Sequence, residues 1–191
     1  MKKLILASAS PRRKEILSQA GFVFEIMPAY NDEIQRGDSP EEIAENLARD
    51  KAEHVAGRCE EPCLVLGADT IVVCDGEIMG KPADEEDAAS MIRRIQGRAH
   101  QVYTGVAIAD REGSAADIRT FHQRTDVWVY PMTEEEIWEY VNSKDGEDKA
   151  GSYGIQGPFA RYVEKIHGDY LNVVGLPLSR LCMELKAYTR E

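Results

Sequence analysis

Cysteine and histidine are scarce in this chain, and neither is arranged to hold zinc. The sequence has four of each among 191 residues. Cys59 and Cys63 have C-x3-C spacing, but no second cysteine pair or histidine pair accompanies them, so a structural zinc site is not expected. Cys63, Cys74 and Cys182 occur in apolar stretches, which predicts buried free thiols. The four histidines also show no pairing for a catalytic triad.

Long hydrophobic runs and the common nucleotide-loop motifs are absent too. No apolar stretch approaches the ~18 residues that a membrane-spanning helix needs. Residues 4–9 are too short for the apolar core of a signal peptide, so we expect a cytoplasmic protein that does not bind a membrane. The sequence contains no G-x-x-x-x-G-K-[ST], no G-x-G-x-x-G and no G-x-S-x-G. A hydrolase that uses water, a divalent metal and carboxylates is the simplest chemistry left.

Positive charge is in deficit, with a net charge of −11 at pH 7. This balance argues against a nucleic acid or an anionic membrane surface as a partner. It does not exclude a small anionic substrate, because a local basic pocket can lie in an acidic protein. The excess of carboxylates could also hold cations, since carboxylate oxygens are natural ligands of magnesium.

The order of apolar patterns predicts a mixed α/β fold, in which helices flank a mixed sheet. We expect one domain over residues 1–191, with two lobes around a central cleft as the alternative. We also expect a break in strand structure at residues 67–70 and an exposed hairpin loop at residues 110–116. Helices are predicted over residues 11–20, 40–55, 84–95, 133–141 and 177–185, and strands over residues 4–7, 22–26, 64–66, 71–73, 102–109, 120–130 and 162–166.

Residues 8–13, with sequence Ser-Ala-Ser-Pro-Arg-Arg, follow the first strand directly. Ser10 is predicted as the N-cap of a helix and Pro11 as its first residue. A helix start gathers unpaired N–H groups and partial positive charge, and Ser8, Arg12 and Arg13 add hydroxyl and guanidinium donors. The alternative is an ordinary capped helix with two solvated arginines. As a cluster at a strand end, the segment favours a receptor for an anion, and phosphate fits its donors.

Four charged residues are candidates for the chemistry. Asp69 follows an apolar strand, where it could bind a metal or act as a general base toward water; a turn aspartate that caps local N–H groups is the alternative. Lys81, in Gly-Lys-Pro, is either aimed at phosphate or simply exposed. Glu33 and Lys51 are individually unremarkable, because most charged residues are solvated.

Residues 149–157 form a second informative segment, with three glycines that permit close backbone contact with a ligand. Tyr153 offers an aromatic face. The Gln156 amide both donates and accepts hydrogen bonds, as the imide edge of uracil or thymine requires. A flexible surface loop is the alternative.

Five segments together resemble the Maf family of nucleoside triphosphate pyrophosphatases. They are LASASPRR at 6–13, GADTIV at 67–72, GKP at 80–82, DKAGSYGIQG at 148–157 and GDYLNVVGLP at 168–177. The resemblance implies cleavage between the α- and β-phosphates of a nucleotide, giving the monophosphate and pyrophosphate. It also implies a mixed α/β fold similar to inosine triphosphate pyrophosphatases, and a homodimer.

The resemblance further assigns roles to individual residues. Asp69 corresponds to the proton acceptor, and Glu33 would share a divalent metal, Mg²⁺ or Mn²⁺, with it. Substrate choice is assigned to Arg12, Thr70 and Gln156, and phosphate binding to Ser8, Arg13, Lys51 and Lys81.

The form Ser-Tyr-Gly-Ile-Gln-Gly is similar to the branch that acts on dTTP and UTP. The branch that acts on 7-methyl-GTP carries a glutamate near the Gln156 position. A neutral amide suits a pyrimidine imide, whereas a carboxylate suits the donor edge of a positively charged methylated guanine. Two alternatives stay open: a 7-methyl-GTP pyrophosphatase, and a non-catalytic nucleotide-sensing regulator of cell division.

Overall fold

The computed structural model describes residues 2–31, 33–113 and 115–188. Within it the chain divides into two compact units. Unit 1 consists of Met1–Asp69, Thr104–Gln123 and Gly175–Glu191, and unit 2 consists of Thr70–Tyr103 and Arg124–Val174. Asp69 is therefore the last residue of the first segment of unit 1, and Thr70 begins unit 2.

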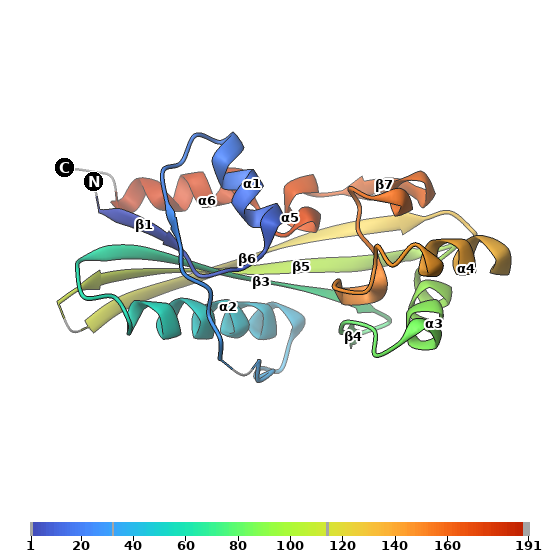
Figure 1. Cartoon of the computed structure of the whole chain (residues 1–191), viewed down its shortest axis with the longest axis horizontal. Coiled ribbons are helices and arrows are strands. Elements are labelled where there is room, and N and C mark those ends of the chain that lie inside the picture. Colours follow the sequence, from blue (N-terminus) through green and yellow to red (C-terminus); the bar gives the residue numbers. More distant parts are fainter. Residues whose placement is uncertain (1, 32, 114, 189–191) are drawn as a thin grey trace. The chain divides into compact units, whose positions relative to one another are not determined.

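In the described part of the chain seven strands form one mixed sheet, with the order β2-β1-β3-β5-β6-β7 and β4 paired to β3. β1 is parallel to both β2 and β3, whereas β4 and β7 are antiparallel to β3 and β6. β3, β5 and β6 are the long strands in Figure 1. The predicted mixed α/β fold is confirmed. The strands are β1 (Lys3–Leu6), β2 (Glu25–Ile26), β3 (Cys63–Cys74), β4 (Glu77–Met79), β5 (Ala99–Glu112), β6 (Ala115–Val129) and β7 (Val163–His167).

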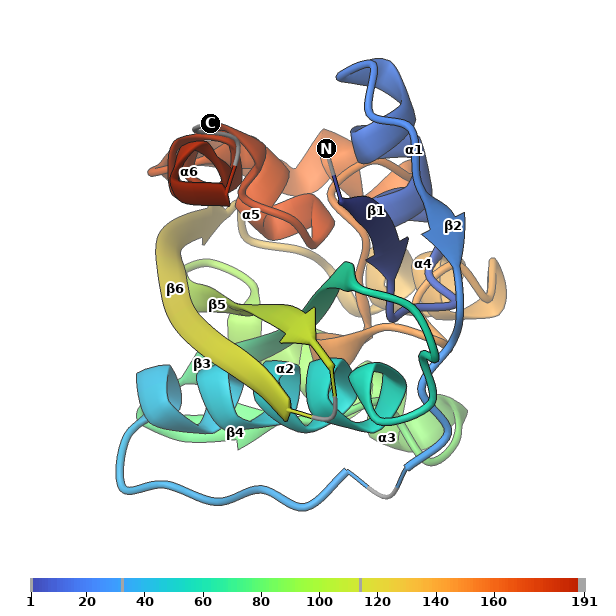
Figure 2. The same ribbon diagram turned by 90° about the vertical axis from the view of Figure 1, so that its left-hand side faces the viewer.

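Unit 1 contains the helices α1 (Pro11–Gln19), α2 (Pro40–Ala56) and α6 (Leu178–Leu185), and the short 3₁₀ helix η3 (Lys186–Tyr188). Figures 1 and 2 show α2 and α6 on opposite faces of the strands of this unit. On the α6 side, Glu184 forms an ion pair of 2.7 Å with Arg119 of β6. α2 starts at Ser39, whose side chain accepts a hydrogen bond from the Glu42 N–H.

α2 packs on the sheet of unit 1 through very small residues. A Cβ atom on Gly67 of β3 would lie 2.3 Å from the Ala48 carbonyl oxygen, and one on Gly105 of β5 would lie 2.1 Å from that of Ala44. Ala44, Ala48 and Ala52 are completely buried. Gly67 and Gly105 therefore allow the backbone of α2 to approach the sheet closely.

Unit 2 contains α3 (Glu85–Ile95), α4 (Glu134–Asn142), α5 (Tyr170–Val174), η1 (Ala150–Ser152) and η2 (Pro158–Tyr162). Thr133 and Glu136 form a reciprocal capping box that starts α4, as their spacing predicts. Phe159 is completely buried, and its ring centroid lies 4.9 Å from that of Tyr140 and 4.8 Å from that of Tyr153. These rings form the aromatic part of the core of unit 2.

Several local predictions are wrong. The break expected at residues 67–70 does not exist: β3 runs through it, because small residues let α2 cover the strand without interrupting it. The hairpin loop expected at residues 110–116 is mostly strand, with Asp110 of β5 accepting a hydrogen bond from Lys2; Ser114 lies outside the described residues. The strand predicted over residues 22–26 shortens to β2, and α5 is an additional helix.

The structure also bears on the predicted burial of the cysteines and on the search for a membrane-spanning helix. Cys59, Cys63 and Cys74 are buried free cysteines, and Cys182 is partly buried. Among the residues described, no helix combines the length and apolar character needed to cross a membrane.

Candidate active site

Residues 8–13 join β1 to α1 in unit 1. Ser10 is the N-cap and Pro11 follows it, as predicted, but the Ser10 side chain makes no capping hydrogen bond. The Ser10 N–H instead donates to the Ser8 hydroxyl oxygen at 3.2 Å. The first turn of α1 also lacks an acidic residue. This helix start therefore keeps the partial positive charge that favours an anion.

Arg13 is held by two hydrogen bonds within unit 1. Its Nε donates to the Gly175 carbonyl oxygen at 2.9 Å, and its Nη1 donates to Ser8 Oγ at 3.2 Å. Burial lowers the pKa of Arg13, while the negative charges of Asp69 and Glu33 act in the opposite direction. A guanidinium titrates so far above neutrality that Arg13 stays charged, and its fork is oriented before any ligand arrives.

Lys51 joins two of the predicted carboxylates. It projects from α2, and its Nζ contacts Asp69 Oδ1 and lies 2.8 Å from Glu33 Oε1. The Lys51 and Asp69 side chains are only 15% and 12% exposed, whereas that of Glu33 is 55% exposed. The carboxylates therefore converge on one ammonium group, and Asp69 Oδ2 receives no hydrogen bond from the described part of the chain. The contact of α2 with Gly67 brings Lys51 to this position.

The donor chemistry of this cluster fits a divalent cation. Carboxylate oxygens are the ligands that Mg²⁺ and Mn²⁺ prefer, and Asp69 and Glu33 already converge on one positive charge. Among the described residues, no group of three or more His, Cys, Asp or Glu side chains could hold a metal by itself. Asp69 and Glu33 could therefore supply only two ligands to a metal, and the other ligands would have to be substrate oxygens or water.

The predicted site residues divide between the two units. Unit 1 brings together Ser8, Arg13, Lys51, Glu33 and Asp69, and the charge of Arg12 acts on Arg13. Unit 2 holds three others, namely Thr70, which is partly buried, and Lys81 and Gln156, which are exposed.

Within unit 2, two of the predicted segments are connected directly. The Gly151 N–H donates to the Gly80 carbonyl oxygen at 2.9 Å, so the segment that carries Lys81 is bonded to the segment that carries Gln156. A hydrogen bond of 3.3 Å from the Gly157 N–H to the Gly154 carbonyl closes a turn over residues 154–157. We call this the glutamine turn, because Gln156 lies exposed at its tip.

Tyr153 does not offer its ring to a ligand, contrary to the prediction. It is 5% exposed and packs on Phe159, while its hydroxyl lies 2.6 Å from His100 Nε2. Burial lowers the pKa of His100 to about 4, so the imidazole is neutral near pH 7. Tyr153 therefore anchors its segment in the core of unit 2.

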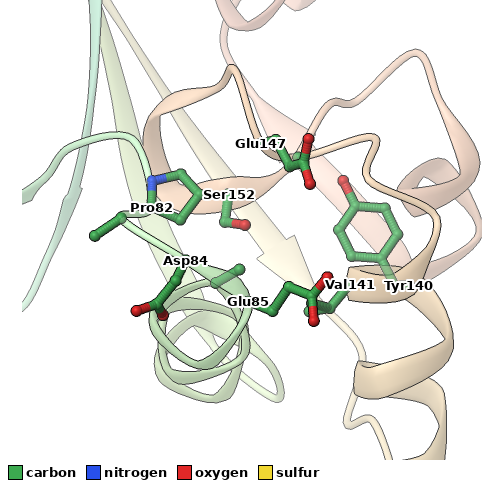
Figure 3. Close-up of a pocket in the computed structure, with 10 residues that line it drawn as sticks. Pro82, Asp84, Glu85, Tyr140, Val141, Glu147 and Ser152 are labelled. Atoms are coloured by element: carbon green, nitrogen blue, oxygen red, sulfur yellow. The ribbon is translucent and has the colours of Figure 1, made fainter.

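Unit 2 also contains a cavity of about 260 Å³ that the sequence did not indicate (Figure 3). The Ser152 hydroxyl points into it, and Glu85 and Glu147 lie on its walls. Lys144 Nζ lies 3.9 Å from Glu85 Oε1 and 3.4 Å from Glu147 Oε1. The lining residues are Pro82, Ala83, Asp84, Glu85, Ala88, Tyr140, Val141, Gly146, Glu147 and Ser152, none of them a predicted site residue.

These features define an α/β protein with a mixed sheet and an anion-receptive cluster of cations and carboxylates. The chain belongs to the Maf family: the family described as Maf-like protein matches residues 3–188. The resemblance inferred from the five sequence segments is thereby confirmed.

Curated relatives match the chain over nearly its whole length. It is 47% identical to a dTTP/UTP pyrophosphatase of Agathobacter rectalis, with 97% of each chain covered. It is 49% and 50% identical to dTTP/UTP pyrophosphatases of Bacillus cereus and Bacillus mycoides, with 98% of this chain and 96% of each relative covered. The structure of the Staphylococcus aureus Ham1 protein is similar in fold, with a TM-score of 0.50 at 14% identity, covering 98% of this chain and 100% of that one.

Proposed function

We propose that this chain is a nucleoside triphosphate pyrophosphatase that hydrolyses dTTP and UTP to the monophosphate and pyrophosphate. Relatives that carry the name dTTP/UTP pyrophosphatase match it over nearly their whole length. A cluster of cations and carboxylates is also the chemistry that a triphosphate requires, because the substrate is a polyanion and the attacking water needs a base.

The observation that carries the proposal is the ammonium of Lys51 between Asp69 and Glu33. In unit 1 the charges of Asp69 and Glu33 also act on Arg13. The Arg13 guanidinium is held in place by Ser8 and Gly175. Cations and carboxylates are thus close together before substrate arrives, which supports our assignment of phosphate binding to the cations and water activation to the carboxylates. Such preorganisation is the largest source of acceleration in many enzymes.

In the proposed reaction, Asp69 is the general base. Its Oδ2 accepts a proton from a water whose oxygen attacks the α-phosphorus, and the bond from that phosphorus to the bridging oxygen breaks. Pyrophosphate leaves with the bonding electron pair, and the monophosphate keeps the new oxygen. Ser8, Arg13 and Lys51 donate to phosphate oxygens and offset the charge that spreads in the transition state.

Asp69 and Glu33 are the proposed holders of a divalent cation. When bound there, Mg²⁺ or Mn²⁺ supplies positive charge to the phosphate oxygens and orients them. The coordination described above, two carboxylates completed by substrate and water, is typical of magnesium in nucleotide enzymes.

In unit 2 the proposed reader of the base is Gln156. Its amide oxygen accepts from the imide N–H of uracil or thymine, while its NH₂ donates to a ring carbonyl. We propose phosphate binding for Lys81, and a share in substrate choice for Thr70 and, in unit 1, for Arg12.

Pyrophosphate release from a nucleotide panel tests the proposal. The purified chain, with Mg²⁺ or Mn²⁺, is expected to release pyrophosphate from dTTP and UTP, and Asp69→Asn to lose most turnover while it still unfolds in one cooperative thermal transition. Glu135→Gln, an exposed change on α4, is the control. Release from 7-methyl-GTP alone would overturn the substrate assignment. Nucleotide binding without turnover would favour the sensing regulator instead.

A further inference from the structure

Side chains that the proposed reaction does not use contact the glutamine turn on the side facing the core of unit 2. The proposed function requires Gln156 to present its amide in one orientation, although the residue is exposed. An exposed side chain on an unsupported turn would sample many orientations, and ordering it on binding would weaken affinity. The contacts beneath the turn therefore bear on substrate choice.

Tyr140 and Asp145 form a hydrogen-bonded support. The Tyr140 hydroxyl donates to Asp145 Oδ2 at 3.0 Å and accepts from the Gly154 N–H at 3.3 Å. Tyr140 is 2% exposed, because its ring packs against Phe159. The first corner of the glutamine turn is thus tied, through one phenol, to a carboxylate and to the core of unit 2.

The Asp145 carboxylate also fills the space next to both corners of the turn. A Cβ atom on Gly157 would lie 2.6 Å from Asp145 Oδ1, and one on Gly154 would lie 3.3 Å from Oδ2 and 2.8 Å from Lys149 Cε. The Lys149 ammonium contacts the Asp145 carbonyl oxygen. A side chain at either glycine would therefore have to displace Asp145 or Lys149, so these two side chains lie directly against the corners of the turn.

Between these corners, one residue of the turn is anchored in the core and the next is exposed to solvent. Ile155 is 8% exposed and packs inward, whereas its neighbour Gln156 faces solvent. Since Ile155 is held by the core and the corners by Tyr140 and Asp145, the backbone that carries the Gln156 amide is fixed before substrate binds.

We propose that Asp145, acting with Tyr140, is a positioning residue for pyrimidine recognition: it fixes the glutamine turn so that the Gln156 amide meets the imide edge of the base. The inference rests on the proposed reading of the base by Gln156. It adds Asp145 and Tyr140 as residues that do not touch the substrate but influence which nucleotide is preferred.

A comparison of UTP with CTP tests the positioning role, because these nucleotides differ only at the base edge that Gln156 would read. Tyr140→Phe removes only the hydroxyl, and Asp145→Asn keeps an acceptor while removing the charge. Tyr140→Phe loses both the charge-assisted bond to Asp145 and the bond from the Gly154 N–H. We expect it to lower the UTP-over-CTP ratio of kcat/KM about tenfold, on the scale of one charge-assisted hydrogen bond. The loss should come from a raised KM for UTP with kcat nearly unchanged, and Asp145→Asn should lose less than Asp145→Ala.

A double-mutant cycle with Gln156→Ala separates positioning from general damage. If Asp145 and Tyr140 act through Gln156, then Tyr140→Phe will not change the UTP-over-CTP ratio further in the Gln156→Ala background. If Tyr140→Phe lowers the UTP-over-CTP ratio as much in the Gln156→Ala background as it does alone, the inference is overturned. An unchanged ratio in the Tyr140→Phe single variant also overturns it. If Gln156→Ala itself leaves the ratio intact, the proposed reading of the base fails instead. Glu135→Gln is the matched carboxylate control, and faster hydrogen exchange at the Gly154 amide in Tyr140→Phe is the expected structural readout.

Discussion

Substituting Gly67 by alanine tests whether the backbone contact of α2 positions the cluster of Lys51, Asp69 and Glu33, which we propose to be catalytic. The new Cβ would lie 2.3 Å from the Ala48 carbonyl oxygen and 2.8 Å from the Ala52 nitrogen, where ordinary contact begins at 3.4 Å. Both neighbours are helix backbone, so no side chain can rotate away. The helix must move by about 1 Å, the difference between 3.4 and 2.3 Å. Overpacking of this kind costs about 2 kcal/mol, which lowers Tm by roughly 4–8 °C for a chain of this length.

The same displacement bears on catalysis, because Lys51 lies immediately before Ala52 on α2. Moving α2 away from β3 separates the Lys51 ammonium from Asp69, whose position is set by the strand. A misplacement of about 1 Å can lower turnover ~100-fold. Gly67→Ala should therefore lose activity as well as stability, although Gly67 carries no side chain.

Thermal unfolding and pyrophosphate release measure the two effects. Gly57→Ala is the matched control: it lies just past the end of α2, its φ is −60°, and its nearest neighbour would be an ordinary 3.5 Å away. It should melt and turn over like the parent chain. A Gly67→Ala chain with the parental Tm and turnover would refute the idea that this contact positions Lys51.

Three further perturbations have defined outcomes. Folding lowers the pKa of His100 to about 4 from an ordinary value near 6.5, so between these pH values the unfolded chain binds a proton that the folded chain does not. The free energy of unfolding should therefore fall by about 2–3 kcal/mol as the pH drops from 7 to 4.5. Denaturant titrations should show a smaller fall for His100→Gln. Thr133→Ala removes the α4 capping box and should cost about 1 kcal/mol in urea unfolding, without affecting kcat. Lys51→Met should reduce pyrophosphate release about 100-fold, because one preorganised cation is lost, whereas Lys51→Arg should retain more activity; equal rates for the two would contradict this role.

Features that depend on neighbours in sequence could be predicted. The starts of α3 and α4 follow from Asp84 and Thr133, since a cap needs only the residue and the next turn. The spacing of Ser39 and Glu42 predicts a capping box at the start of α2, and Ser39 does cap the helix, but the Glu42 carboxylate accepts from the Asp38 N–H. Such a one-residue shift depends on the incoming backbone, which local pattern does not fix.

Features that depend on packing could not be predicted. The convergence of Glu33 and Asp69 on Lys51 requires α2 to lie against β3, and no spacing in the sequence encodes that approach. The support of the glutamine turn depends on Tyr140, which lies fourteen residues before Gly154 and accepts its N–H. Its only sequence signal is the pair of glycines around Ile-Gln, and these are equally typical of a flexible loop. The resemblance to the family supplied the site residues that local chemistry left undecided.

In the glutamine turn, the residues that hold the backbone differ from the residue proposed to read the base. This difference has a consequence for how substrate preference could change. Ile155 and the corners hold the backbone, while Gln156 contributes almost nothing to the core. A mutation at position 156 would therefore alter which hydrogen bonds the turn presents at little expense to folding. Most surface substitutions change stability by less than about 0.5 kcal/mol. Under the proposed reading of the base by Gln156, a new specificity would need one substitution on an unchanged scaffold, and selection could test it without first acquiring stabilising mutations.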